Sequence, residues 1–158
     1  MTASHPPSTQ ADFVIERQYP AAPGAVFAAW ADPAAKRLWS DRHPEHTTHY
    51  ALDFRLHGHE THRVRHADGR LQEIEKLFFD IVPGQRIVFA YDIRLDGRAL
   101  SVSLATVEFF AAPAGTRMVY TEQISYLDGH EDRAQRLRGT EEGLDRLGLY
   151  LAKPGTAS

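Results

Sequence analysis

Residues 71–95 read LQEIEKLFFDIVPGQRIVFAYDIRL and predict a β-hairpin. On either side of the turn dipeptide Pro83-Gly84 lies a run rich in β-branched and aromatic residues, which is typical of strands. In the second run Ile87, Phe89 and Tyr91 share one face, because successive side chains of a strand point to opposite sides. Two antiparallel strands joined by a tight turn are therefore expected here.

Further strands are predicted on both sides of this hairpin. From Thr48 onward the period is also two, and Tyr50, Leu52, Phe54 and Leu56 share one face. The Asp-Gly pairs at 68–69 and 96–97 favour tight turns between neighbouring strands. About seven strands are expected in all: the run from Thr48, the two strands of the hairpin, and four further runs. These four are Phe13 to Tyr19, Glu60 to Arg65, Leu100 to Phe110 and Arg117 to Leu127.

Helical signals lie before and after these strands. Pro23 suits the first turn of a short helix, and a second can begin at Pro33 with Asp32 as its N-cap. After Gly129 the period changes to 3.6, which predicts an amphipathic helix over Glu131 to Ala152. Leu137, Leu144, Leu147 and Leu151 form its apolar stripe. The order predicts an α+β domain in which the long helix covers the apolar face of a curved antiparallel sheet.

Composition limits the number of domains and the class of function. With 158 residues we expect one domain over 12–152, with flexible tails over 1–11 and 153–158. The chain has 18 basic and 21 acidic residues, scattered along the sequence, which argues against nucleic-acid binding. Cysteine is absent, which excludes disulfides and a thiol nucleophile. No stretch reaches the roughly 20 apolar residues of a membrane span, so we expect a cytoplasmic protein.

Several separated stretches resemble the START-like (SRPBCC) superfamily, and within it the family named for activators of the heat-shock-protein ATPase. The resemblance implies a helix-grip fold, usually a single domain in bacteria, with an apolar cavity between sheet and helix. It covers nearly the whole chain from Phe13 to Leu151. The matching pieces are YPAAP at 19–23, VFAAW at 26–30, Asp32-Pro33 with Leu38-Trp39, FFDIVPGQRIVF at 78–89, Gly115-Thr116-Arg117 and GLDRL at 143–147.

Glu122 is the most informative polar residue. It shares strand parity with Met118, Tyr120, Ile124 and Tyr126, so a carboxylate is expected within an apolar cavity. Such a buried acid could serve as general acid, base or ligand anchor, or it could pair with an arginine or lie at the cavity mouth. The predicted pocket residues are Trp30, Trp39, Tyr50, Leu52, Phe54, Phe89, Tyr91, Met118, Tyr120, Glu122 and Leu144.

Three other groups of residues receive simpler interpretations. Seven of the nine histidines lie between His43 and His66, but their spacing matches no zinc motif, so we expect solvated histidines, no metal and no cofactor. Glu73 and Glu75 face the same way, as paired-carboxylate catalysis requires, but two acidic residues of a strand next to Lys76 favour a solvated outer face; which way they face is unsettled. Ser101 and its neighbouring hydroxyls lie outside any Gly-x-Ser-x-Gly motif, so no serine hydrolase is indicated.

Three functions remain open. The first is binding of a hydrophobic or aromatic small molecule in the cavity. The second is a cyclase- or hydratase-type reaction in the same cavity, with Glu122 and a tyrosine transferring protons. The third, implied by the family name, is activation of a chaperone ATPase; we expect no chaperone partner, because the eukaryotic activators carry an additional N-terminal domain that is absent from this sequence. The chain could also pair as a homodimer.

Overall fold

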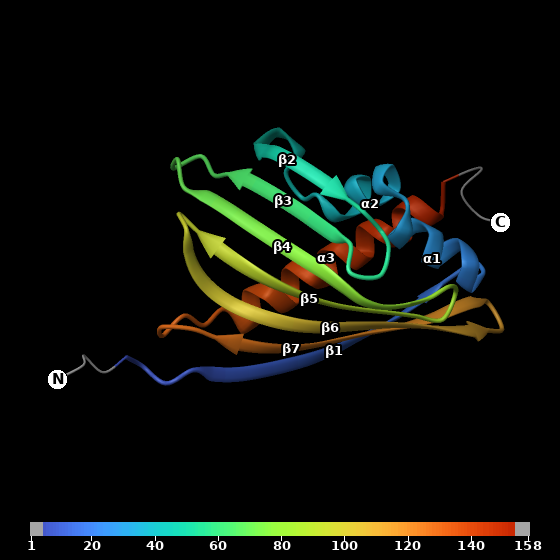
Figure 1. Ribbon diagram of the computed structural model, residues 1–158. Coiled ribbons are helices and arrows are strands. Elements are labelled where there is room, and N and C mark those ends of the chain that lie inside the picture. Colours follow the sequence, from blue (N-terminus) through green and yellow to red (C-terminus); the bar gives the residue numbers. More distant parts are fainter. Residues whose placement is uncertain (1–4, 154–158) are drawn as a thin grey trace.

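Seven strands form one antiparallel sheet in this computed structural model, which describes residues 5–153 (Figure 1). Their order across the sheet is β1-β7-β6-β5-β4-β3-β2, so every neighbour except β1 and β7 is also a neighbour in sequence. This is the pattern that consecutive hairpins produce. The bounds are β1 Thr9–Tyr19, β2 Thr47–Leu52, β3 His59–Arg65, β4 Leu71–Val82, β5 Arg86–Leu95, β6 Arg98–Ala112 and β7 Gly115–Tyr126.

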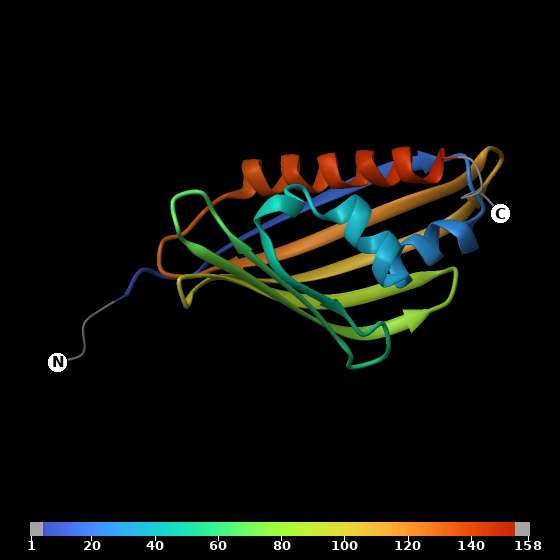
Figure 2. The ribbon, with the colours of Figure 1, turned by 90° about the horizontal axis from the view of Figure 1, so that it is seen from above.

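Helices cover one face of this sheet. The short helices α1 (Pro23–Ala31) and α2 (Pro33–Ser40) follow β1, a 3-10 turn η1 (Pro44–His46) precedes β2, and α3 (Arg133–Leu151) ends the chain. The curved sheet wraps around α3, and α1 and α2 lie beside the C-terminal half of α3 (Figure 2). Asp32 caps α2 as expected, because its carboxylate accepts a hydrogen bond from the Ala35 amide at 3.0 Å. The predicted helix-grip architecture is confirmed.

The core lies between the concave face of the sheet and α3. Every second residue of β7 from Thr116 to Tyr126 is buried, as the period-two pattern predicts. Opposite them, Leu144, Leu147 and Leu151 of α3 are buried, and each contributes about 1.5–3 kcal/mol by leaving water. No helix within residues 5–153 is long and apolar enough to cross a membrane.

Two contacts fix α3 against β1. The buried hydroxyl of Tyr19 donates a hydrogen bond to the Leu144 carbonyl oxygen at 2.8 Å. A Cβ atom at Gly148 would lie only 3.3 Å from the Tyr19 ring, so the glycine allows this close approach. The end of β1 therefore sets the position of the helix above the sheet.

Several element boundaries differ from the expected ones by one to four residues. β1 begins at Thr9, not Phe13, because Thr9 to Asp12 continue the ladder with β7. The predicted flexible segment 1–11 thus includes the first residues of β1, whereas residues 1–4, and residues 154–158 of the predicted C-terminal tail, lie outside the described part. The long helix covers Arg133–Leu151, two residues later at its start and one earlier at its end than expected.

The strand expected to continue from Thr48 to Leu56 ends at Leu52. The chain turns there, since the Asp53 amide already bonds to the His59 carbonyl and the Gly58 amide to the Arg55 carbonyl. A side chain at Gly58 would place its Cβ 2.1 Å from the Asp53 carbonyl oxygen, so this turn requires glycine. As a result Leu56 is exposed.

Candidate functional site

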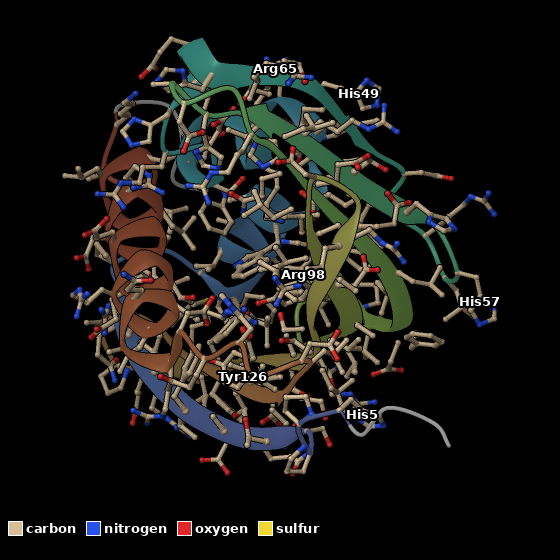
Figure 3. The ribbon with its side chains drawn as sticks, turned by 90° about the vertical axis from the view of Figure 1, so that its left-hand side faces the viewer. His5, His49, His57, Arg65, Arg98 and Tyr126 are labelled. Atoms are coloured by element: carbon tan, nitrogen blue, oxygen red, sulfur yellow. The ribbon has the colours of Figure 1, made fainter. Side chains whose placement is uncertain are left out.

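A cavity of about 480 Å³ lies between the sheet and α3. This is within the size range of small-molecule pockets. Side chains fill much of the space between α3 and the strands that face it, as the view from the side shows (Figure 3). Residues that line the cavity include Ile74, Lys76, Phe89, Tyr91, Ile93 and Tyr120 from the sheet, Arg136, Gly139, Gly143 and Leu144 from α3, and Trp30, Lys36 and Trp39 from α1 and α2.

A second depression, of about 730 Å³, lies on the outer face of the sheet over β1, β6 and β7. Its charged lining residues, Asp12 and Arg133, are exposed to solvent. The inner cavity, by contrast, combines aromatic walls with buried charged groups. We therefore take the inner cavity as the candidate site.

The first group of buried polar residues is centred on Glu122. This carboxylate is fully buried in β7 and accepts hydrogen bonds from the Tyr91 hydroxyl at 2.6 Å and the Tyr120 hydroxyl at 2.7 Å. Burial, together with the Glu122 charge, raises the pKa of both tyrosines above its ordinary value, so both hydroxyls stay protonated and donate. Arg136 Nη1 lies 3.6 Å from Glu122 Oε2 and compensates its charge.

Arg136 crosses from α3 to the sheet and ties the two walls together. Its guanidinium donates to the Ser103 hydroxyl at 3.1 Å, to the Ser101 hydroxyl at 2.9 Å and to Asp132 at 3.1 Å. Burial acts to lower the pKa of Arg136, but the surrounding groups, Asp132 and Glu122 among them, outweigh it and raise that pKa. The cluster is thus a fully hydrogen-bonded set of charges under the cavity wall.

The second group of buried polar residues is centred on Glu60 of β3, which is only 3% exposed. Lys36 donates to both of its carboxylate oxygens, at 2.9 and 3.0 Å, and the Tyr50 hydroxyl donates to Oε2 at 2.6 Å. Burial acts to raise the pKa of Glu60, but Lys36, Lys76 and the Tyr50 hydroxyl outweigh it and lower that pKa to about 2. Burial lowers the pKa of Lys36 to about 8 against the opposing charge of Glu60. Both members of the pair are therefore charged at neutral pH.

Aromatic rings surround the second cluster and close one end of the cavity. The rings of Trp30 and Trp39 meet edge-on with centroids 4.8 Å apart, and Trp30 stacks on Tyr120 at 6.4 Å. The Lys36 ammonium lies 5.2 Å from the Trp30 ring and 5.5 Å from the Trp39 ring, within range of cation–π attraction. Trp39 Nε1 donates to the Ala29 carbonyl at 2.9 Å, whereas Trp30 Nε1 is buried without a partner among residues 5–153.

Glycine forms part of the helix wall. Gly139 and Gly143 lie in the interior of α3 and both line the cavity. A Cβ atom added at Gly139 would meet no atom within 4 Å, and one at Gly143 would only touch Arg146 at 3.6 Å. Packing therefore does not require glycine at either position, and its effect is to leave the helix backbone open to the cavity.

The structure places the predicted pocket residues in three settings. Glu122 lies behind the wall, with its carboxylate bonded to two lining tyrosines, and Tyr50 lies behind the wall too, bonded to Glu60. Met118 belongs to the core, and Leu52 and Phe54 are partly buried against the core; none of these three lines the cavity. Those that line the cavity are Trp30, Trp39, Phe89, Tyr91, Tyr120 and Leu144.

Four charged residues of the site were not among those predicted from the sequence: Lys36, Glu60, Lys76 and Arg136. Charged side chains are assigned to the surface by default, and burial of Lys and Glu is rare unless they are paired. Their partners come from different elements, α2 with β3 and β4, and α3 with β7. One signal was available: Arg136 lies one residue before Leu137 and eight before Leu144, near the apolar stripe of the helix.

The clustered histidines and the paired glutamates lie mainly outside this site. His49 and His57 are on the outer side of the sheet, away from α3 (Figure 3). Glu75 also faces outward and lies 2.8 Å from both His59 and the Thr61 hydroxyl, while Glu73 faces Arg63 across the strand at 3.3 Å. Within residues 5–153 no three His, Cys, Asp or Glu side chains are arranged to hold a metal ion.

His43, His62 and His66 differ from the other clustered histidines, because they line the cavity. His62 lies 3.6 Å from Asp41, and His66 lies 2.7 Å from the Gln72 amide oxygen. Burial lowers the pKa of His62, with the charges of Lys76 and Lys36 acting in the same direction and those of Asp41 and Glu60 against it. His62 therefore contributes a polar wall next to the two lysines.

Comparisons with known proteins agree with the fold. The chain is 46% identical to an uncharacterized protein from Rhizobium leguminosarum, over 92% of this chain and 96% of that one, with a TM-score of 0.88. It is 38% identical to a protein from Rhizobium loti, over 92% and 99% of the two chains, with a TM-score of 0.86. A protein from Chromobacterium violaceum shares the fold at 22% identity, over 90% and 97% of the chains, with a TM-score of 0.73.

No curated protein matches the chain. The family described as Activator of Hsp90 ATPase homolog 1-like protein matches residues 20–152, which include every helix and all strands except β1. These are the residues that form the cavity and both polar clusters. The chain belongs to the Activator of Hsp90 ATPase homolog 1-like family.

Proposed function

We propose that this protein binds a small organic molecule with an apolar, aromatic body in the cavity between the sheet and α3. The observation that carries the proposal is a cavity of about 480 Å³ whose walls combine aromatic rings with buried, hydrogen-bonded charges. Pockets for small molecules are typically apolar with a few fixed polar groups that orient the ligand. Here the rings of Phe89, Tyr91 and Trp30 supply the apolar surface.

The helix wall supports the same function. Glycine in a helix interior costs about 1 kcal/mol relative to alanine, and neither Gly139 nor Gly143 is required by packing. A bound molecule can approach the α3 backbone at these positions. The Arg136 cluster joins this wall to the sheet, so the two sides of the cavity are held at a fixed distance.

Thermal unfolding with a panel of mono- and bicyclic aromatic compounds tests the proposal. A ligand at 100 times its Kd stabilises the native state by about 2.7 kcal/mol, which corresponds to a rise of several degrees in Tm for a domain of this size. The variant Gly139→Leu should abolish the shift by filling the cavity, whereas Gly24→Ala, exposed on α1 and remote from the cavity, should retain it. If no compound in the panel changes Tm, and native mass spectrometry of the purified protein shows no retained molecule, the proposal fails.

A cyclase- or hydratase-type reaction is the second candidate. The specific observation in its favour is the hydrogen-bonded group of Tyr91, Tyr120 and Glu122, in which two protonated hydroxyls face the cavity side of a fully buried carboxylate. Such a group could polarise a carbonyl and return a proton to it. Replacement Glu122→Gln should then abolish turnover while ligand affinity changes little; equal turnover in the variant would rule this role out.

A further inference from the structure

Two ammonium groups share one carboxylate at the wall of the cavity. Lys36 and Tyr50 supply all the side-chain hydrogen bonds that Glu60 accepts within residues 5–153. Lys76 Nζ lies 3.5 Å from Glu60 Oε1, the oxygen that Lys36 Nζ also approaches at 2.9 Å, and Lys76 donates no hydrogen bond within the same residues. The group therefore carries one positive charge more than it has negative charges. A partly buried charge without a full partner is unfavourable, so this excess needs an explanation.

Lys76 faces the cavity. Its side chain is 22% exposed, it lines the cavity, and its ammonium lies 5.0 Å from the Phe89 ring and 5.6 Å from the Tyr91 ring. A ligand that lies along these two rings would bring its end group to the ammonium. Three donors of Lys76 are then available for that group.

Other charged groups of the wall have contacts of their own: Arg146 donates to the Trp39 carbonyl oxygen at 2.8 Å, and Asp41 accepts a hydrogen bond from the Thr47 hydroxyl at 2.7 Å and lies 3.6 Å from His62. Arg136 is paired with Asp132 at 3.1 Å and lies 3.6 Å from Glu122. Arg42 lies 3.5 Å from Glu142. Lys76 differs from these groups because its neighbouring carboxylate, Glu60, already accepts two hydrogen bonds from Lys36, and because its ammonium lies beside aromatic surface.

We propose that the ligand of this cavity is an aromatic acid whose carboxylate pairs with Lys76 while its ring lies against Phe89 and Tyr91. This inference rests on the proposed function, to which it adds the charge and the orientation of the ligand. A carboxylate would balance the two lysines and Glu60, and would accept the hydrogen bonds that Lys76 otherwise leaves unused. The opposite end of the molecule then points to the open backbone of α3 at Gly139 and Gly143.

Binding of three probes that differ only in their end group tests this assignment: 2-naphthoate, 2-naphthamide and 2-naphthylmethylamine. Charge-assisted hydrogen bonds are about twice as strong as neutral ones, so the wild-type protein should bind the acid at least tenfold more tightly than the amide, and the amine most weakly. Lys76→Met should reduce the affinity for the acid to that for the amide and leave the amide unchanged. Lys76→Arg should retain the preference for the acid.

A control variant separates local pairing from net charge. Arg94→Met removes one positive charge from β5, but Arg94 is exposed and paired with Asp92, away from the cavity lining, so the acid should bind as to wild type. Without ligand, Lys76→Met should differ little in stability from the wild-type protein, because the lost attraction between Lys76 and Glu60 is offset by the lost repulsion between Lys76 and Lys36. If the wild-type protein binds the acid no more tightly than the amide, and Lys76→Met behaves in the same way, the role of Lys76 is overturned while the binding function stands. Binding of none of the three probes would count against both.

Discussion

Replacing Gly139 by alanine should make the protein more stable and its cavity less able to bind. Gly139 lies in the interior of α3, where glycine is about 0.8–1.0 kcal/mol less favourable than alanine. An added Cβ atom meets nothing within 4 Å, so no clash offsets the gain. We therefore expect the free energy of unfolding to rise by about 1 kcal/mol, and Tm by roughly 2–4 °C for a domain of this size.

The same methyl group enters the cavity. Gly139 lines it, and a methyl that meets a well-packed ligand typically costs about 1–3 kcal/mol, which is a loss of affinity of roughly 5- to 150-fold. Stability would be measured by urea unfolding followed by circular dichroism, and affinity for 2-naphthoate by isothermal titration calorimetry. Gly24→Ala is the matched control: it is a helical glycine with free space around its Cβ, exposed on α1, and should leave affinity unchanged.

The stability and the ligand affinity of Gly139→Ala can each depart from the expected result independently. A Gly139→Ala protein that is less stable than wild type would mean that the added methyl group clashes, and that α3 lies closer to the sheet than in this structure. Greater stability with unchanged affinity would show that the ligand does not contact α3. Only the combination of greater stability and weaker binding supports a helix wall kept open for a ligand.

Three further changes test the buried polar groups. Glu60→Gln should lower the free energy of unfolding by about 3 kcal/mol at pH 7, because the pKa of Glu60 is about 2 in the folded protein against an ordinary 4.5. This stabilisation is present above pH 4.5 and is lost as the pH falls toward 2. The free energies of unfolding of the two proteins, measured by urea titration, should therefore converge in acid. Arg136→Met leaves Glu122 buried without its cation and should cost about 3–5 kcal/mol in the same assay, and a loss below 1 kcal/mol would contradict the pairing. Tyr19→Phe removes one buried hydrogen bond to α3 and should lower stability by about 1 kcal/mol, with little effect on probe affinity.

The fold was predictable from the sequence because its signals are local. The Asp-Gly and Pro-Gly turns separate runs of period two, and the change to period 3.6 after Gly129 identifies α3. The alternation in β7 also placed Glu122 correctly among buried residues. Each of these conclusions depends on residues near one another in the chain.

The site was less predictable because its partners come from separate elements. In β4 the pairing with β5 shifts between Phe78 and Asp80, so the parity of the strand changes at Phe79. Before this point Ile74, Lys76 and Phe78 face inward, and a strict alternation counted back from Ile81 would place Lys76 outside. The burial of Lys36 could not be predicted either, because the sequence of α2 gives no sign that its partner carboxylate lies on β3.

The buried charges and the helix glycines are costly features of one region. A buried ion pair is seldom more stabilising than well-packed apolar side chains of similar volume, and this chain has two such groups, at Glu60 and at Glu122, at the wall of one cavity. The glycines at 139 and 143 add about 1 kcal/mol each to that cost from the helix side. Selection for stability alone would replace the buried ion pairs with apolar side chains and the two glycines with alanine. Because local departures from stable packing concentrate at functional sites, their meeting around one cavity from sheet and helix together argues that the cavity is kept for a ligand.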